Sequence, residues 1–180
     1  GTDTLTPVLS DNWDADQPWR LDSYEQGGGY QALRKALRMA PDEIVTQVKD
    51  SGLRGRGGAG FPTGMKWTFV PSKEKRGAKP VYLLCNADES EPGTFKDRIL
   101  IEKDPHQIIE GALICAYAVG AAQVFLYVRG EMALAQERLA QALNDAYAKG
   151  YVGRSIGGSD FSCDVVLAWG AGAYIVGEET

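Results

Sequence analysis

Three short apolar runs alternate with two long helical segments between residues 80 and 169 of this chain, and this alternation limits the folds open to it. The apolar runs are residues 80–86, 123–128 and 163–169. Turn residues bound the first run, which is as apolar as a strand buried on both faces, and the other two are also predicted to be strands. The segments 105–120 and 131–149 have helical patterns. Because a helix of this length connects parallel strands, the sequence predicts an α/β fold with a mainly parallel sheet and flanking helices.

The region before the first run is predicted to be helical. From Tyr30 the apolar residues recur at helical spacing, and Pro41 opens a second helix that Gly52 closes. Residues 1–29 lack a clear period but contain aromatic side chains, so we expect an amino-terminal arm that packs on another surface. The 180 residues then divide into this arm and one domain, residues 30–180.

Charge and hydropathy exclude several classes of protein. The net charge is −5 and no dense basic patch occurs, which argues against nucleic acid as a partner. The longest apolar stretch begins at Ile108, is interrupted by Glu110, and is too short to cross a bilayer, so we expect a buried helix and no direct membrane insertion. The first residues do not resemble a secretory signal, and we therefore expect a cytoplasmic location.

The cysteine and histidine residues do not predict a metal site. Cys85, Cys115 and Cys163 are far apart and lack C-x-x-C spacing, so we expect reduced core residues and no metal ligands. His106 follows Pro105 at a helix start, which favours a surface or capping residue over a catalyst.

A glycine-rich segment, "SGLRGRGGAGFPTGMKW", covers residues 51–67. Residues 55–60 match G-x-G-x-x-G, but they follow a helix, whereas the dinucleotide motif follows a strand. The segment is also not a nucleoside-triphosphate loop, because Trp67 stands where Ser or Thr would follow Lys66. Glycine lets backbone N–H groups approach a ligand closely, and the segment carries arginine and lysine for an anionic group.

Two interpretations of this glycine-rich segment remain open on its composition alone. It can be a flexible surface loop, or it can bind a phosphate or lie against a ring. Phe61, Trp67 and Phe69 favour the second interpretation, because flexible loops seldom carry three large aromatic residues.

Two more segments follow predicted strands, where ligands bind in parallel sheets. "NADESEPGTFKDR", residues 86–98, collects carboxylates. These form either a solvated acidic loop, which composition alone slightly favours, or acceptors for the hydroxyl and ring N–H groups of a nucleotide cofactor. "GAGAYIVGEET", residues 170–180, begins like a dinucleotide turn but has Ile175 in place of the third glycine.

Together these motifs, with "VRGE" at 128–131, resemble one family: the flavin-bearing, NADH-oxidising subunit (51 kDa or F-type) of respiratory complex I, NADH:quinone oxidoreductase. The resemblance extends from about Tyr24 to Thr180. It implies a Rossmann-like sheet that binds FMN and NADH, with a hydride passing from the nicotinamide C4 to the flavin N5. No side chain then needs to act as a nucleophile or general acid, and the chain's part is to hold two rings in contact.

The resemblance also implies roles for individual residues. Glu91 is assigned to the catalytic centre, near the nicotinamide. The cofactor-binding residues implied for FMN are Gly55, Arg56, Gly57, Gly58, Lys66, Asn86, Asp88, Glu91, Tyr174, Gly177, Glu178 and Glu179. Those implied for NADH are Phe61, Phe69, Glu91 and Glu179.

This chain departs from the family pattern in two ways. The family continues into a ubiquitin-like domain and a helical bundle that binds a [4Fe-4S] cluster, so we expect that cluster only in a full-length chain. Val176 stands where family members usually have cysteine. The implied partners are other complex I subunits, including a thioredoxin-like [2Fe-2S] subunit and the large iron–sulfur subunit, in the peripheral arm of the membrane-bound complex. The alternatives are a diaphorase subunit of an NAD-linked hydrogenase or formate dehydrogenase, and a scaffold fragment without activity. A nucleoside-triphosphate binder ranks last.

Overall fold

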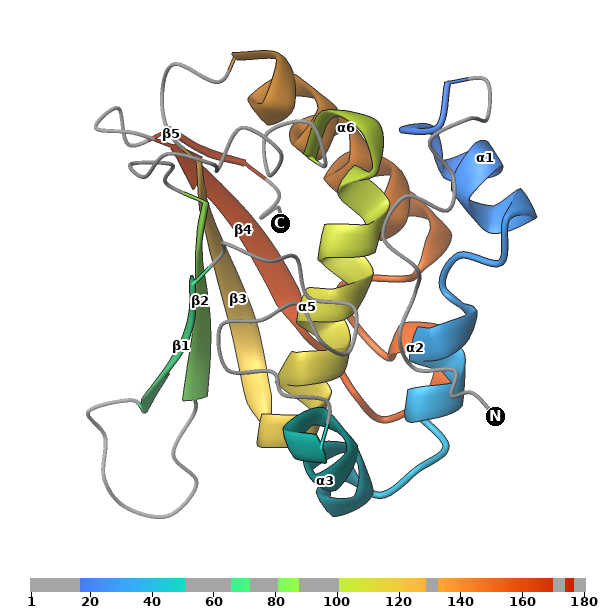
Figure 1. The fold of residues 1–180 in the computed structure, drawn as a ribbon, viewed down its shortest axis with the longest axis vertical. Helices are drawn as coiled ribbons and strands as arrows, with labels where there is room; N and C mark the ends of the chain where they lie inside the picture. Colours follow the sequence, from blue (N-terminus) through green and yellow to red (C-terminus); the bar gives the residue numbers. More distant parts are fainter. Residues whose placement is uncertain are drawn as a thin grey trace.

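The fold was analysed in a computed structural model, which describes residues 17–50, 66–71, 81–87, 101–128, 133–169 and 174–176. A five-stranded sheet forms one layer, and helices form two further layers on one of its faces (Figure 1). The strands are β1 (Lys66–Pro71), β2 (Val81–Ala87), β3 (Ala121–Val128), β4 (Asp164–Trp169) and β5 (Tyr174–Val176).

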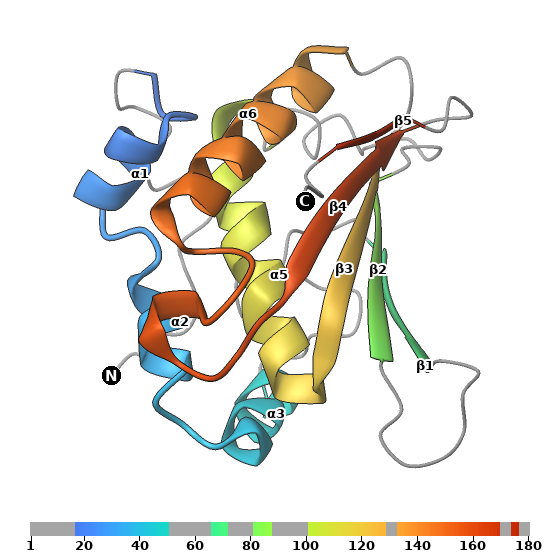
Figure 2. The ribbon, with the colours of Figure 1, turned by 180° about the vertical axis from the view of Figure 1, so that it is seen from behind.

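The strands lie in the sheet in the order in which they occur in the chain, β1-β2-β3-β4-β5. β2, β3 and β4 are parallel, and β1 and β5 are antiparallel to their neighbours. The connections β2 to β3 and β3 to β4 run through α5 (Pro105–Val119) and α6 (Ala133–Lys149). Since both crossovers move in the same direction along the sheet, right-handed connections place both helices on the same face, as Figures 1 and 2 show.

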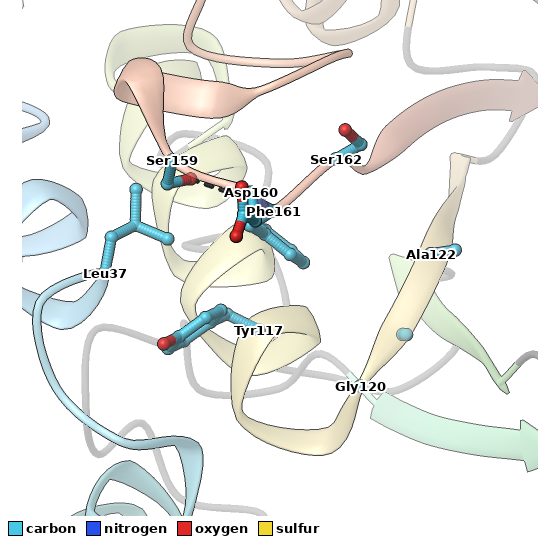
Figure 3. Close-up of a pocket in the computed structure, with 9 residues that line it drawn as sticks. Leu37, Tyr117, Gly120, Ala122, Ser159, Asp160, Phe161 and Ser162 are labelled. Carbon is cyan, nitrogen blue, oxygen red and sulfur yellow. Dashed lines mark hydrogen bonds between the residues drawn. The ribbon is translucent and has the colours of Figure 1, made fainter.

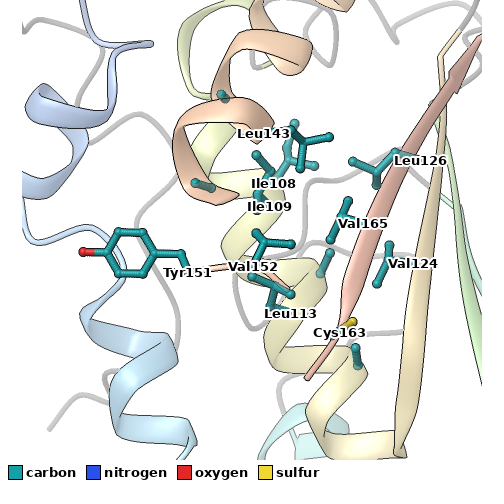
Figure 4. Packing of buried hydrophobic residues seen from close by; sticks show 14 of the residues in the cluster. Ile108, Ile109, Leu113, Val124, Leu126, Leu143, Tyr151, Val152, Cys163 and Val165 are labelled. Carbon is teal, nitrogen blue, oxygen red and sulfur yellow. The ribbon is translucent and has the colours of Figure 1, made fainter. Parts of the chain in front are cut away.

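The core lies between the sheet and these two helices. Val124 and Leu126 of β3 and Val165 of β4 point towards α5 and α6, and their side chains are buried (Figure 4). Along β3 the burial alternates, and Tyr127 on the other face is 43% exposed. α5 is mostly apolar and buried over most of its length, because it lies between the sheet and the outer helices.

The outer layer consists of α1 (Leu21–Gln26), α2 (Gln31–Ala36) and α3 (Pro41–Asp50). α2 and α3 contact α5, and α1 contacts α6 (Figure 2). Leu21 and Tyr24 belong to the same buried cluster as the sheet residues, so the described part of the predicted arm packs on the domain core. The proposed boundary at residue 29 stays a prediction.

Local sequence signals explain where the long helices begin and end. Pro105 occupies the first turn of α5, where its missing N–H leaves no hydrogen bond unmade. α5 ends at Gly120, which adopts a left-handed conformation with φ of 78°. The three predicted strands and both predicted crossover helices are present, and the prediction of a Rossmann-like α/β fold is confirmed.

Some predictions of local structure were wrong. β1 and β5 were not predicted, because both are edge strands whose apolar pattern is short or interrupted. The helix expected from Tyr30 is shorter than its periodicity suggested: Tyr30 precedes it in a left-handed conformation with φ of 67°, and the helix ends at Ala36. Within the described residues, no helix is both long and apolar enough to cross a membrane.

Candidate functional site

The carboxyl ends of β2, β3 and β4 lie along one edge of the sheet, and this edge is the candidate site. The register aligns Asn86 with Tyr127, and Tyr127 with Ala168, across the three parallel strands. Lys66, at the start of antiparallel β1, pairs with Asn86. Tyr174, at the start of β5, pairs with Trp169 at the end of β4. The backbone of three sequence motifs therefore reaches the same edge.

The width of this edge follows from the strand spacing. From Lys66 in β1 to Tyr174 in β5 there are four inter-strand steps, roughly 19 Å at about 4.8 Å per step. Phe69 pairs with Leu83, three pairs away from the edge, and so lies about 10 Å along β1 from Lys66. Among the predicted residues in β1, Lys66 is thus at the edge and Phe69 is nearer the middle of the strand.

The remaining predicted site residues lie outside the described residues. They are Gly55, Arg56, Gly57, Gly58, Phe61, Asp88, Glu91, Gly177, Glu178 and Glu179. Their assignments stay predictions. The side-chain roles of Lys66, Phe69, Asn86 and Tyr174, whose backbone the structure describes, also stay predictions.

A buried polar cluster, formed by Tyr24, Tyr30, His106 and Glu110, joins α5 to the outer helices. The Glu110 carboxylate accepts hydrogen bonds from the Tyr24 hydroxyl, from the Tyr30 N–H at 3.0 Å and from the Leu33 N–H at 2.8 Å. Two of these donors belong to the first turn of α2, where backbone N–H groups have no partner within the helix. Glu110 therefore caps α2 from a different helix.

His106 completes this cluster and is 1% exposed, so the prediction of a surface or capping residue was wrong. Its Nδ1 lies 2.7 Å from the Tyr30 hydroxyl, and its ring stacks on Tyr24 with centroids 5.5 Å apart. Burial lowers the pKa of His106 to about 4, because the imidazolium form loses its hydration. Burial also raises the pKa of Glu110, although the donors that it accepts from oppose this shift.

A second contact joins α6 to the chain just before α5. The Arg138 guanidinium donates a hydrogen bond of 2.7 Å to the Glu102 carbonyl, and it lies 3.5 Å from the centre of the Trp19 ring. Neither Arg138 nor the buried cluster was predicted from the sequence. The signal available for Glu110 was a carboxylate within an apolar helix, which requires buried hydrogen-bond donors.

The two described cysteine side chains are not poised to react. Cys115 and Cys163 are free and buried, and burial raises the pKa of each thiol to about 12. For these two, the prediction of reduced core residues is confirmed. Among the described residues, no group of three or more His, Cys, Asp or Glu side chains could hold a metal ion.

A pocket of about 600 Å³ lies at the opposite edge of the sheet (Figure 3). It is lined by Leu37 of the outer layer, by Tyr117 near the end of α5, by Gly120 between α5 and β3, and by Phe161. The Tyr117 hydroxyl donates to the Met39 carbonyl at 2.7 Å and is therefore used within the fold. Of the predicted site residues that the structure describes, none lines this pocket.

The sheet, its crossover helices and the motifs at its carboxyl edge define the class: an α/β domain of the kind that binds a nucleotide cofactor at its strand ends. The comparison with protein families is more specific. Residues 48–180 match the family described as the Nuo51 FMN-binding domain, and the chain belongs to this family.

Curated relatives agree with this assignment, and the three described here are all F-type subunits of NADH-quinone oxidoreductase. The chain is 59% identical over 175 residues to one from Rhizobium meliloti, covering 97% of the chain and 41% of that protein. It is 55% identical to that of Mycobacterium tuberculosis (strain H37Rv), covering 98% of the chain and 40% of that protein. For the Aquifex aeolicus protein the identity is 54%, over 89% of the chain and 37% of that protein. The chain thus spans about two fifths of the length of these relatives.

Proposed function

We propose that this chain binds FMN at the carboxyl edge of its sheet and takes part in NADH oxidation within an NADH-quinone oxidoreductase. One observation carries the proposal: the register brings Lys66, Asn86 and Tyr174, which belong to three separate motifs, to the same edge. The residue types fit the cofactor, because lysine can pair with a phosphate and an asparagine amide can bond hydroxyl or ring groups.

The residues of this chain have distinct proposed tasks at the edge. The glycine-rich segment lets the backbone approach the cofactor closely, and its cations offset the phosphate charge. The acidic segment and the terminal motif accept hydrogen bonds from ribityl hydroxyls and the ring edge. The residues proposed for FMN are Gly55, Arg56, Gly57, Gly58, Lys66, Asn86, Asp88, Glu91, Tyr174, Gly177, Glu178 and Glu179.

FMN, when bound, supplies a hydride acceptor. The chain's own part is to hold NADH in van der Waals contact with it, for which Phe61 and Phe69 are proposed to flank the adenine. Glu91 and Glu179 are proposed near the nicotinamide end. Glutamates near the ribose would repel the 2′-phosphate of NADPH, which favours NADH over NADPH.

The curated relatives are subunits of a larger enzyme, and we propose that this chain likewise works in the peripheral arm of a membrane-bound complex, on its cytoplasmic side. The proposed partners are a thioredoxin-like [2Fe-2S] subunit and the large iron–sulfur subunit. Electrons would leave through a [4Fe-4S] cluster held by a longer chain. The three relatives belong to NADH-quinone oxidoreductases, which favours this assignment over a hydrogenase or formate dehydrogenase diaphorase.

The test is an anaerobic visible spectrum of the purified protein after FMN reconstitution, before and after NADH is added. Flavin absorbance that comigrates with the protein and bleaches with NADH is the expected result. A folded protein that retains flavin but does not bleach would contradict NADH oxidation by this chain. A folded, colourless protein would favour the scaffold alternative.

A further inference from the structure

Three tyrosine rings lie in contact between α5 and the outer helices, with Tyr30 in the middle. The Tyr24 ring meets the Tyr30 ring edge to face, with centroids 5.2 Å apart. On its other side Tyr30 stacks on Tyr151, with centroids 4.0 Å apart and an angle of 11° between the planes. All three side chains are buried, and Tyr151 points away from the sheet towards the outer layer (Figure 4). We call these three residues the tyrosine row.

The two outer hydroxyls of the tyrosine row donate to carboxylates. Tyr24 donates to Glu110, and Tyr151 donates to Glu25 at 2.6 Å. A phenol that loses an electron becomes a strong acid, so a neutral radical forms only where a base within hydrogen-bond reach accepts the proton. Burial raises the pKa of the Glu110 carboxyl, which favours proton transfer from Tyr24.

His106 is the corresponding base for the central tyrosine. Its Nδ1 lies 2.7 Å from the Tyr30 hydroxyl, which is within the reach of proton transfer. Burial lowers the pKa of His106 to about 4, so its imidazole is neutral at pH 7 and keeps one ring nitrogen as an acceptor. With Nδ1 as this acceptor, each hydroxyl of the tyrosine row has its own base.

The tyrosine row approaches the surface at Tyr151. Its partner Glu25 has a side chain that is 26% exposed and pairs with Lys149 at 3.0 Å. The Arg34 guanidinium donates to the Tyr151 hydroxyl at 3.2 Å, and its Cζ atom lies 5.6 Å from the centre of the Tyr151 ring. A positive charge beside a ring opposes the loss of an electron from it. Tyr151 is thus the end nearest to solvent, and the two inner tyrosines are easier to oxidise.

We propose that the tyrosine row is a redox-active site, which one-electron oxidants of the oxygen-radical class convert to a neutral tyrosyl radical. The oxidant takes one electron from Tyr151, whose phenol proton moves to Glu25. Tyr30 then gives an electron to Tyr151 and its own proton to His106. Glu25 returns the first proton to Tyr151, so the radical has moved inwards by one residue.

The same steps in reverse discharge the site. A reductant of the ascorbate class donates one electron at Tyr151, and each base returns its proton to its own phenol. The positive charges of Arg34 and Lys149 beside this end favour the approach of an anionic reductant. This inference does not rest on the function proposed above, because none of these residues belongs to the candidate flavin and NADH site.

The test exposes the purified protein to photogenerated tris(bipyridine)ruthenium(III), a one-electron oxidant, and follows the tyrosyl radical by EPR and transient absorption. The variants Tyr151→Phe, Tyr30→Phe and Glu25→Gln keep the shapes of the side chains. A glutamine amide accepts a hydrogen bond but does not take up the proton. Tyr117→Phe is the matched control, because the Tyr117 hydroxyl donates at 2.7 Å to the Met39 backbone carbonyl, which does not take up a proton either.

We expect a long-lived tyrosyl radical in the wild-type protein, which ascorbate removes. Tyr151→Phe and Glu25→Gln should each slow the formation of this radical by about tenfold, equivalent to a barrier change of about 1.4 kcal/mol. Tyr30→Phe should shorten its lifetime by about tenfold, because the radical then stays at the end nearest to solvent. Tyr117→Phe should match the wild type in both formation rate and lifetime.

Three outcomes would overturn the inference. The first is a folded wild-type protein that forms no long-lived tyrosyl radical. The second is a radical whose formation and lifetime are unchanged in Tyr151→Phe and Tyr30→Phe, or change equally in Tyr117→Phe. The third is an unchanged formation rate in Glu25→Gln, which rejects proton transfer to this carboxylate. Melting temperatures check folding, and if Tyr30→Phe does not fold, Tyr151→Phe and Glu25→Gln decide.

Discussion

Glu110 in the second turn of α5 accepts a hydrogen bond of 2.8 Å from the backbone N–H of Leu33, a residue 77 positions earlier in the chain. The same carboxylate accepts from Tyr30 N–H, so it replaces the local side chain that usually caps a helix. Because the Glu110 carboxylate belongs to α5 and its backbone donors belong to the start of α2, the position of α2 depends on α5.

Replacing Glu110 with Ala should destabilise the fold by about 4 kcal/mol, because it leaves two backbone N–H groups and a tyrosine hydroxyl buried without their acceptor. Glu110→Gln keeps one acceptor oxygen and should cost about half as much. Urea unfolding measures the free energy of unfolding of both variants. The control is Glu137→Ala on the exposed face of α6, which should change this free energy little. A loss below about 1 kcal/mol for Glu110→Ala would show that water replaces the carboxylate.

His106 should make stability depend on pH between about 4 and 6.5. In this window the unfolded chain takes up a proton at an imidazole with the ordinary pKa of 6.5, whereas the folded chain, with a pKa of about 4, does not. The unfolded state binds more protons, so stability falls as pH falls, by roughly 3 kcal/mol over the window.

The check on His106 is the free energy of unfolding at several pH values, compared with His106→Asn. The variant should have a flatter profile from pH 6.5 to 4. Glu110 acts in the opposite direction, because its raised pKa lowers stability as pH rises above the usual glutamate range. Glu110 is present in both proteins, so the difference between their profiles isolates His106. Parallel profiles would mean that His106 is protonated in the folded state.

Gly29→Ala should destabilise more than Gly28→Ala, although the residues are adjacent. A Cβ atom at Gly29 would lie 2.1 Å from the Tyr24 ring. A Cβ atom at Gly28 would meet nothing within 4 Å, so the only strain there comes from the backbone φ of 96°, which alanine rarely adopts. We expect losses of about 3 and about 1 kcal/mol, since displacing Tyr24 also disturbs its bond to Glu110. Equal losses in urea unfolding would show that the ring can move freely.

Glu91→Gln should leave the melting temperature unchanged and alter the Michaelis constant for NADH or the rate of flavin reduction by about tenfold, equivalent to about 1.4 kcal/mol. The substitution removes a charge beside the proposed nicotinamide site at little steric cost. Stopped-flow reduction at several NADH concentrations separates the two effects. Unchanged kinetics, with Glu137→Gln as the reference, would remove Glu91 from the site.

Val176→Cys should restore the residue usual in the family without a large change in flavin affinity. Val176 pairs with Leu167 across β5 and β4, close to the carboxyl edge. Valine and cysteine are similar in size and apolar, so the FMN dissociation constant should stay within about threefold, while the flavin potential can shift. A titration of FMN fluorescence measures the dissociation constant, and a redox titration measures the flavin potential. A large loss of FMN affinity would contradict this expectation.

The sequence predicted those parts of the fold that depend on continuous apolar patterns. The strands at β2, β3 and β4 and the helices between them were identified because buried elements need apolar residues at regular spacing. β1 was missed because Lys66 and Pro71 at its ends gave no strand signal, and β5 because it is only three residues long. Edge strands depend on pairing with a neighbour more than on their own pattern.

The candidate site was predicted from motifs, and only its backbone at the edge could be compared with the structure. The buried cluster was missed for a different reason. His106 was interpreted as a surface or capping residue, and Glu110 only as an interruption of an apolar stretch, because ionisable groups rarely lie inside. Their partners, Tyr24 and Tyr30, are 76 or more positions away in the chain, a separation that periodicity does not reveal.

The sheet order, which equals the chain order, has a consequence for synthesis on the ribosome. Each new strand can add to the one made just before it, so the sheet can grow from β1 towards β5 without waiting for distant segments. The outer helical layer cannot be completed in this way. Its α2 helix is synthesised early but receives its cap from Glu110 only after about 80 more residues have emerged, so the outer layer cannot be secured before α5 has been made.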